Sequence, residues 1–162
     1  MRLKNKDITL RKVRRSDCLD IWRWRNSPEV KKACLRKGAV PLETHKKWFD
    51  KKFDNPSTDI YIAHKPSSGR KIGVVRFDKE GRDAVVSANL NPEFIGMGLG
   101  PFILKRATVK YMKTGKAGKV IAVIKKGNLR SQKAFLKADY RYKDDGIENG
   151  NKVRIYWYTR EG

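Results

Sequence analysis

Three glycines at alternate positions separate a segment with strand character from a segment with helix character. Gly96, Gly98 and Gly100 follow an expected strand at 83–90 and precede an expected helix at 101–113. Glycine has no Cβ, so it can adopt positive φ and lets a ligand approach the backbone closely. A helix N-terminus directly after the loop adds free N–H groups and the positive end of a dipole. The sequence therefore predicts an anion-binding loop, suited to the pyrophosphate of a nucleotide-like cofactor.

The length and composition fit one globular domain. The chain has 162 residues, of which 39% are hydrophobic and 35% are charged. A chain of this length buries about 68–70% of the surface that it exposes when unfolded. We therefore expect a single domain at 1–162. No apolar run approaches the ~20 residues of a membrane helix. No signal-type apolar run follows the basic N-terminus, so we expect a cytoplasmic protein that makes no membrane contact.

Cysteine and histidine are scarce. Cys18 and Cys34 are too few for a disulfide framework, and His45 and His64 are the only histidines. No group of these residues has the spacing of metal ligands, so we predict no metal site.

The net charge is strongly positive. Lys and Arg total 39 against 17 Asp and Glu, which gives +22 and a pI near 10.2. This excess predicts attraction to polyanions such as nucleotides, nucleic acid or ribosomes. A generally basic solvated surface explains the charge equally well. The basic residues are spread along the whole chain, which weakens the case for a dedicated nucleic-acid-binding protein.

The order of the expected elements predicts an α+β fold with one mixed, mostly antiparallel sheet flanked by helices. A doubly wound dinucleotide fold is excluded, because the glycine loop follows an antiparallel meander and does not open a first βαβ unit. Ser16, Ser27 and Asn128 are the expected helix N-caps. The expected strands are 8–13, 60–63, 71–77, 83–90, 120–124 and a hairpin from Tyr140 to Tyr158, and the expected helices are 16–26, 27–34, 43–53, 101–113 and 128–138.

Two segments resemble the acetyl-CoA-binding motifs of the GNAT superfamily of N-acetyltransferases. The first is Ala88-Asn89-Leu90-Asn91-Pro92, followed by Ile95-Gly96-Met97-Gly98-Leu99-Gly100 and a helix. The second is the apolar strand 120–124, followed by Asn128-Leu129-Arg130-Ser131-Gln132-Lys133-Ala134-Phe135-Leu136-Lys137-Ala138-Asp139-Tyr140. The loop alone is a weak signal. The loop, the strand order and the second segment together cover nearly the whole chain.

The resemblance implies a GNAT-like fold and an enzyme that transfers the acetyl group of acetyl-CoA to a primary amine, without a covalent enzyme intermediate. The backbone N–H of Leu90 or a neighbour would polarise the thioester carbonyl. Asn91 and Glu93 are the candidates for accepting the proton of the amine, and Ser131 for hydrogen bonding to the sulfur or the pantetheine arm. The implied cofactor-binding residues are Leu90, Asn91, Ile95, Gly96, Met97, Gly98, Leu99, Gly100, Asn128, Ser131 and Phe135.

Three positions depart from the family pattern. Ile95 and Met97 stand where the family loop usually has Gln or Arg and then a basic residue. Phe135 stands where many members have a tyrosine that serves as general acid. These departures leave open a third interpretation, a weakened relative that binds CoA or nucleic acid without turnover.

The segment Trp22-Arg23-Trp24-Arg25-Asn26-Ser27-Pro28-Glu29-Val30 resembles the opening of two GNAT subgroups. One subgroup acetylates protein N-termini, including those of ribosomal proteins, and the other acetylates amino-sugar nucleotides, as in pseudaminic-acid biosynthesis. We favour an amino-sugar nucleotide as acceptor, with a peptide N-terminus as the alternative. The implied acceptor-binding residues are Trp22, Arg25, Asn26 and His45. Both a monomer and a homodimer fit the sequence.

Overall fold

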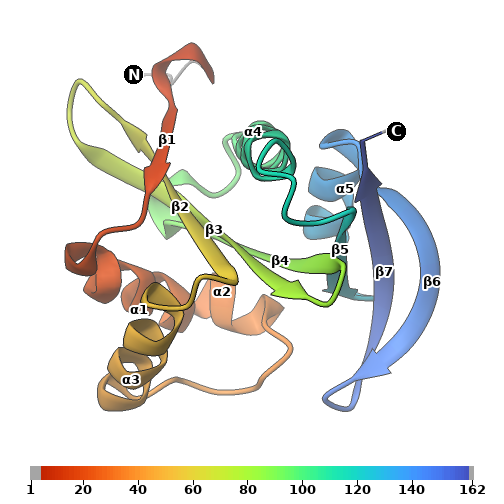
Figure 1. Ribbon diagram of the computed structural model, residues 1–162. Helices are drawn as coiled ribbons and strands as arrows, with labels where there is room; N and C mark the ends of the chain where they lie inside the picture. The colour runs from red at the N-terminus through yellow and green to blue at the C-terminus, as the bar shows by residue number, and fades with distance from the viewer. Residues whose placement is uncertain (1–4, 161–162) are drawn as a thin grey trace.

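One seven-stranded sheet runs through the computed structural model, which describes residues 5–160 (Figure 1). The strands lie in the order β1-β2-β3-β4-β5-β7-β6, and every neighbouring pair is antiparallel except β4 and β5. This arrangement confirms the predicted α+β class with a mostly antiparallel sheet. The strands are β1 (Thr9–Lys12), β2 (Thr58–Lys65), β3 (Arg70–Glu80), β4 (Asp83–Leu90), β5 (Lys119–Lys125), β6 (Arg141–Glu148) and β7 (Asn151–Thr159).

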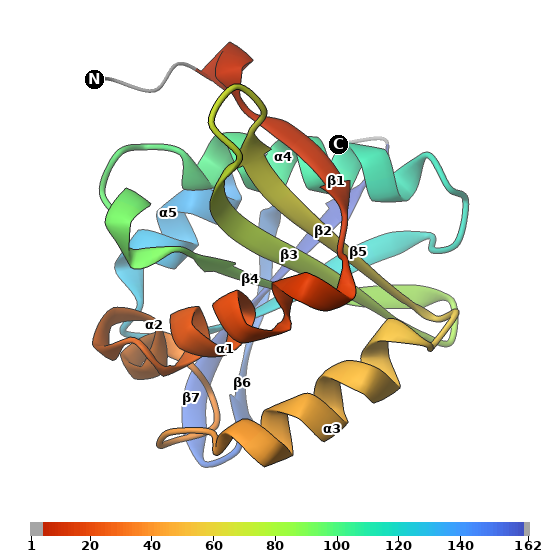
Figure 2. The same ribbon diagram turned by 90° about the vertical axis from the view of Figure 1, so that its left-hand side faces the viewer.

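Five α-helices within the described residues cover the two faces of the sheet. Helices α4 and α5 lie on one face, and α1, α2 and α3 lie on the other (Figures 1 and 2). The helices are α1 (Cys18–Asn26), α2 (Pro28–Ala33), α3 (Leu42–Phe53), α4 (Gly100–Met112) and α5 (Leu129–Lys137). No helix within residues 5–160 is long and apolar enough to cross a membrane.

Two hydrophobic cores result from this layering. The larger core joins the sheet to α4 and α5, and its stacked pair Phe77 and Tyr111 has ring centroids 4.4 Å apart. The smaller core joins α1 and α3 to β2 and β3 only. Its buried members are Ile21, Trp24, Phe49, Ile60, Ile62 and Val74. Each fully buried side chain of this size contributes roughly 1.5–3 kcal/mol, so both helical layers are held to the sheet.

Helix starts differ in part from the sequence predictions. The predicted N-cap at Ser16 is wrong, because α1 begins at Cys18 after a short 3-10 helix, Arg15–Asp17. Ser27 is the N-cap residue of α2, but its hydroxyl donates to the carbonyl of Trp24 at 2.7 Å and caps nothing in α2. Asn128 is confirmed as the N-cap of α5.

Strands β2 and β3 extend beyond their predicted ends. Their ends carry polar residues such as Asp78 and Glu80, which give no hydrophobic signal. These residues nevertheless pair with neighbouring strands: Asp78 pairs with Thr58 of β2 and Val85 of β4, and Glu80 pairs with Asp83 of β4. Backbone hydrogen bonding in a long hairpin therefore decides the strand length here, and side-chain hydropathy does not.

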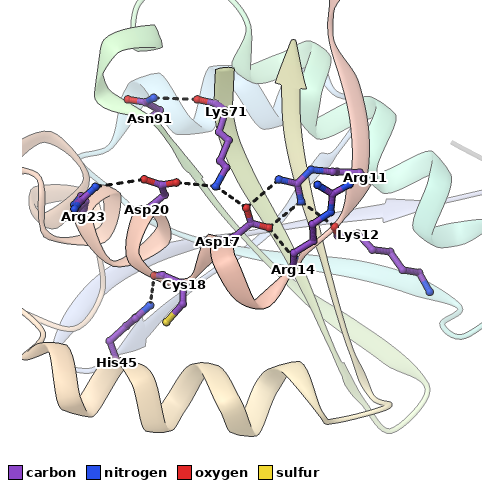
Figure 3. Close-up of polar contacts among 10 residues, drawn as sticks. All are labelled: Arg11, Lys12, Arg14, Asp17, Cys18, Asp20, Arg23, His45, Lys71 and Asn91. Carbon is purple, nitrogen blue, oxygen red and sulfur yellow. Dashed lines mark hydrogen bonds and ion pairs between the residues drawn. The ribbon is translucent and has the colours of Figure 1, made fainter. Parts of the chain in front are cut away.

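A buried carboxylate joins α1 to two strands (Figure 3). Asp17 has no exposed side-chain surface and accepts two hydrogen bonds from Arg11, at 2.8 and 2.9 Å. Lys71 lies 2.8 Å from Asp17 and 2.8 Å from Asp20, and the backbone N–H of Arg14 donates to Asp17 at 2.7 Å. Burial alone would raise the pKa of Asp17, but the hydrogen bonds from Arg11, Lys71 and the Arg14 backbone hold it well below its ordinary value.

We expect Asp17→Asn to lower the free energy of unfolding by about 3–5 kcal/mol, because it leaves two cations beside a neutral buried group. Asp50→Asn is the control, since its pair with Arg15 is exposed and worth about 0–1 kcal/mol. Because the folded-state pKa is depressed, the charge contributes fully above the unfolded pKa of about 3.9 and its contribution shrinks as the pH falls below that value. Urea unfolding from pH 7 to pH 2 measures this. A difference between wild type and Asp17→Asn that stays constant down to pH 2 would contradict the assignment.

Candidate active site

The parallel pairing of β4 and β5 stops after two residue pairs. Ala84 pairs with Val120 and Val85 with Ile121, and no further pair joins the two strands within the described residues. The remaining part of β4, Val86–Leu90, and that of β5, Ala122–Lys125, therefore diverge. The two strands form the sides of a gap at the middle of the sheet.

The end of β4 directs backbone N–H groups into this gap. The N–H of Asn91 donates to the carbonyl of Ile72 on β3 at 2.8 Å, so it points away from β5. Successive residues of a strand direct their hydrogen-bonding groups to opposite sides. The N–H of Leu90, and that of Ala88 before it, consequently face β5. The group predicted to polarise a carbonyl thus lies on the correct side of the strand, although its role stays a prediction.

The glycine loop bends sharply between β4 and α4. After the short 3-10 helix Pro92–Phe94, Gly96 and Gly98 have φ of +85° and +74°, which L side chains rarely adopt. No atom would lie within 4 Å of a Cβ added at either position, so space remains beside the backbone. Gly100 begins α4, whose free N–H groups follow directly. A loop of this shape fits the pyrophosphate of CoA.

The segment from the glycine loop to the end of α5 carries no acidic residue. Residues 94–138 include the loop, α4, β5 and α5 but contain neither Asp nor Glu. The same stretch contains Lys105, Arg106, Lys110, Lys113, Lys116, Lys119, Lys125, Lys126, Arg130, Lys133 and Lys137. The basic residues are spread along the chain, as expected, but the acidic residues are not. The resulting positive field favours the phosphates of CoA.

Helix α5 starts on the far side of the gap. The Asn128 side chain accepts the backbone N–H of Ser131 at 3.2 Å, and Ser131 itself is half-buried in the first turn. Phe135 lies in the larger core, 4.9 Å from Tyr140 in an edge-to-face contact. Burial raises the pKa of Tyr140, whose hydroxyl hydrogen-bonds Thr108 at 2.7 Å. Neither aromatic residue is therefore available as a general acid.

Three predicted acceptor-binding residues hold one segment of chain. The indole N–H of Trp22 donates to the carbonyl of Val40 at 2.7 Å, and Asn26 makes two hydrogen bonds to the Val40 backbone, at 2.9 and 2.8 Å. Arg25 donates to the carbonyls of Arg36 and Gly38. These contacts fix the segment 34–41 between α2 and α3. Direct contact of the three side chains with an acceptor stays a prediction.

The segment 34–41 begins beside the gap. Asn151 of β7 donates to the carbonyl of Leu35 at 2.9 Å, and Lys125 at the end of β5 donates to the carbonyl of Lys32 at 3.1 Å. Trp22, Arg25 and Asn26 thus hold a segment that starts beside the gap, and its part in binding an acceptor stays a prediction.

The remaining predicted residues have structural contacts. The ring of His45 is 3% exposed, and its Nε2 lies 2.9 Å from the carbonyl oxygen of Cys18. Burial lowers the pKa of His45. Asn91 donates to the carbonyl of Lys71 at 2.9 Å and accepts the N–H of Glu93, while Glu93 forms an ion pair with Arg70. His45 and Asn91 are therefore occupied in holding α1 and the end of β4, and nothing in their contacts points to proton transfer.

The sequence did not predict the ion-pair cluster of Lys71, Asp17 and Asp20 beside the end of β4. Lys71 links Asp17 and Asp20 of the α1 region to the strand that anchors Asn91 (Figure 3). A lone Lys or Asp in the sequence gave no signal for this, because the residues are separated by more than 50 positions and meet only in the folded sheet.

A family model described as "Acetyltransferase (GNAT) domain" matches residues 7–141. The chain belongs to the GNAT acetyltransferase family. It is an acetyl-CoA-dependent N-acetyltransferase with the expected fold, and acetyl-CoA is its co-substrate. Within residues 5–160, no group of three or more His, Cys, Asp or Glu side chains could hold a metal ion.

Solved structures share this fold at low sequence identity. A spermidine N-acetyltransferase from Vibrio cholerae, in complex with CoA and spermine, is 15% identical with a TM-score of 0.85, and the match covers 96% of this chain and 97% of that one. The aminoglycoside acetyltransferase AAC(6')-Ib, in complex with coenzyme A and kanamycin, is 16% identical with a TM-score of 0.81 over 95% of both chains. No curated protein sequence matches significantly. The two GNAT subgroups that the opening segment resembles therefore stay predictions.

We expect Gly98→Ala to raise the KM for acetyl-CoA by about tenfold, because an L side chain at this φ costs about 1–2 kcal/mol and shifts the loop. The control is Gly81→Ala in the β3–β4 turn, which has φ +64° and equally open surroundings but lies away from the loop. Steady-state kinetics and thermal unfolding separate the two effects. Equal loss of stability with equal KM values would exclude a role of Gly98 in binding CoA.

We expect Met97→Lys to tighten acetyl-CoA binding by about threefold to tenfold. Met97 is 58% exposed between the two positive-φ glycines, where a lysine ammonium would reach the phosphates. Calorimetry at low and high salt measures this, and the gain should shrink with salt because exposed charges are screened. Met97→Gln, polar but uncharged, is the matched control, and an equal gain in this variant would rule out a charge effect.

Proposed function

We propose that this N-acetyltransferase acetylates the primary amine of an amino-sugar nucleotide in the cytoplasm. The observation that carries the proposal is the charge of the chain, +22 in 162 residues, with no acid between Glu93 and Asp139. The solved relatives bind spermine and kanamycin, which are polycations. A polycation would be repelled by this protein, whereas an anionic carrier such as a nucleoside diphosphate would be attracted.

The residues around the gap suit a transfer that depends on positioning. Acetyl-CoA, when bound, supplies the activated acetyl group. The glycine loop and the start of α4 hold its phosphates, and the N–H groups of Leu90 and Ala88 are directed to where a carbonyl would be polarised. Holding two reactants together in this way can contribute ~7–11 kcal/mol to catalysis.

Neither of the two predicted proton acceptors, Asn91 and Glu93, is well placed to take the proton of the amine. An amine must lose its proton to react. Glu93 is exposed and paired with Arg70, and Asn91 is held by backbone contacts. We therefore propose that the proton leaves to water in the open gap. The hydroxyl of Ser131, in the first turn of α5, is the group that could hydrogen-bond the sulfur.

A protein N-terminus is the second candidate acceptor. The segment Trp22–Val30 resembles the opening of the protein-acetylating subgroup as much as that of the amino-sugar subgroup. The positive charge would bring the enzyme to ribosomes, where nascent or ribosomal N-termini are found. The Ile95, Met97 and Phe135 departures also keep a weakened, non-catalytic relative among the alternatives.

The test is incubation with labelled acetyl-CoA and a panel of amines, read by mass spectrometry. We expect acetylation of nucleotide-linked amino sugars at a kcat/KM at least about tenfold above that of the same sugars without the nucleotide, since one or two charge contacts are worth that factor. Spermidine should be a poor acceptor. Acetylation of peptides alone would move the function to the second candidate. The absence of any product, together with no thermal shift by CoA, would exclude both.

A further inference from the structure

Part of the sheet face that carries α1, α2 and α3 lies outside both hydrophobic cores. The smaller core covers β2 and β3, and the side chains of β4, β5 and β7 on this face belong to neither core. They point this way because their neighbours in sequence, such as Val120 and Tyr156, point into the α4–α5 core. The half-buried members of this open face are Val85, Ile121, Val123, Ile155 and Trp157.

Two lysine ammonium groups, one from β5 and one from β6, lie against the indole ring of Trp157 on β7 between them. The Nζ of Lys119 lies 3.6 Å from the ring centroid, and the Nζ of Lys143 lies 5.2 Å from it. Such contacts are attractive, because the face of an aromatic ring carries partial negative charge. The ring thus places two cationic hydrogen-bond donors near one side chain, and phosphate oxygens accept strong hydrogen bonds from such donors.

Backbone geometry places Lys143 over the ring. The ladder between β6 and β7 shifts between Tyr142 and Asp144, so Lys143 is an extra residue in a β-bulge. Bulges change the direction of a side chain, and they often do so next to binding sites. The Oδ2 of Asp83 lies 3.7 Å from Lys119. Within residues 5–160, no carboxylate forms an ion pair with Lys143.

The cluster lies at a short distance from the gap. Val85, Ile121 and Trp157 form one row across the neighbouring strands β4, β5 and β7, and this row is where the pairing of β4 and β5 ends. Ala88, in the middle of the diverging part of β4, is three residues or about 10 Å further along the strand. That distance is comparable to the length of a hexose ring and the phosphate attached to it.

We propose that Lys119, Lys143 and Trp157 form a subsite for the phosphates of a nucleoside diphosphate carried by the acceptor. The lysines bind phosphate oxygens, the indole holds each lysine side chain beside it, and the apolar floor lies under the sugar. The proposal rests on the proposed function, since it assigns a binding site to the nucleotide part of that acceptor.

The test is calorimetric titration of UDP into the protein saturated with CoA, so that the glycine loop is already filled. The double variant Lys119→Gln/Lys143→Gln should bind UDP at least about tenfold more weakly, because hydrogen bonds to charged groups are lost. The matched control is Lys46→Gln/Lys47→Gln on α3, which removes the same charge from exposed positions away from the cluster. Trp157→Leu should weaken binding in the same direction, since the ammonium groups lose their common support.

The possible outcomes separate the subsite from the function. If the double variant and the control weaken UDP binding equally, the effect comes from net charge alone and the subsite is overturned. The subsite is also overturned if neither variant changes UDP binding, or if the protein does not bind UDP. In kinetics, the double variant should raise the KM for a nucleotide-linked amino sugar while the KM for acetyl-CoA stays the same. If only peptides are acetylated, the proposed acceptor fails, and the UDP titration still decides whether the subsite exists.

Discussion

The candidate site depends on the short parallel pairing of β4 and β5. β4 and β5 share two residue pairs and then separate, while each stays fully bonded to its other neighbour, β3 or β7. The two strands can separate because the antiparallel pairing with β3 and β7 holds each of them in place without hydrogen bonds across the gap. Everything that follows uses this opening: unpaired N–H groups face into it, the glycine loop leaves from one side, and α5 starts from the other.

The fold could be predicted from the sequence because its signals are local and consistent. The apolar run 120–124, the glycine loop and Asn128 each specify one element or one boundary, and their order excludes a doubly wound sheet. Errors arose where a polar residue acts through distant contacts. Ser16 has the residue type of a helix cap, but the side chain that accepts a backbone N–H here is Asp17, from Arg14. The same carboxylate also binds Arg11 and Lys71. The partner of a buried carboxylate cannot be identified from one sequence.

The site was predictable in its backbone part and less so in its side chains. Gly96 and Gly98 are informative residues because few others adopt their conformation. Trp22, Asn26 and His45 are informative only as a motif, and their hydrogen bonds serve the scaffold around the site. Lys143 carries no signal at all, since a bulge in β6 decides which way it points. Backbone constraints can be recognised in residue types, whereas side-chain partnerships require the folded chain.

The hydrogen bonds from Trp22 and Asn26 to Val40 have a consequence for how an acceptor is chosen. They join the segment 34–41 to α1, which Asp17 in turn fixes to β1 and β3. We infer that a segment held in this way lines the gap as a fixed wall, so this side of the gap does not close around a ligand as a means of discrimination. Selection on this side would then depend on the shape and charge that the folded segment already has, because the entropic cost of ordering it is met once, when the chain folds.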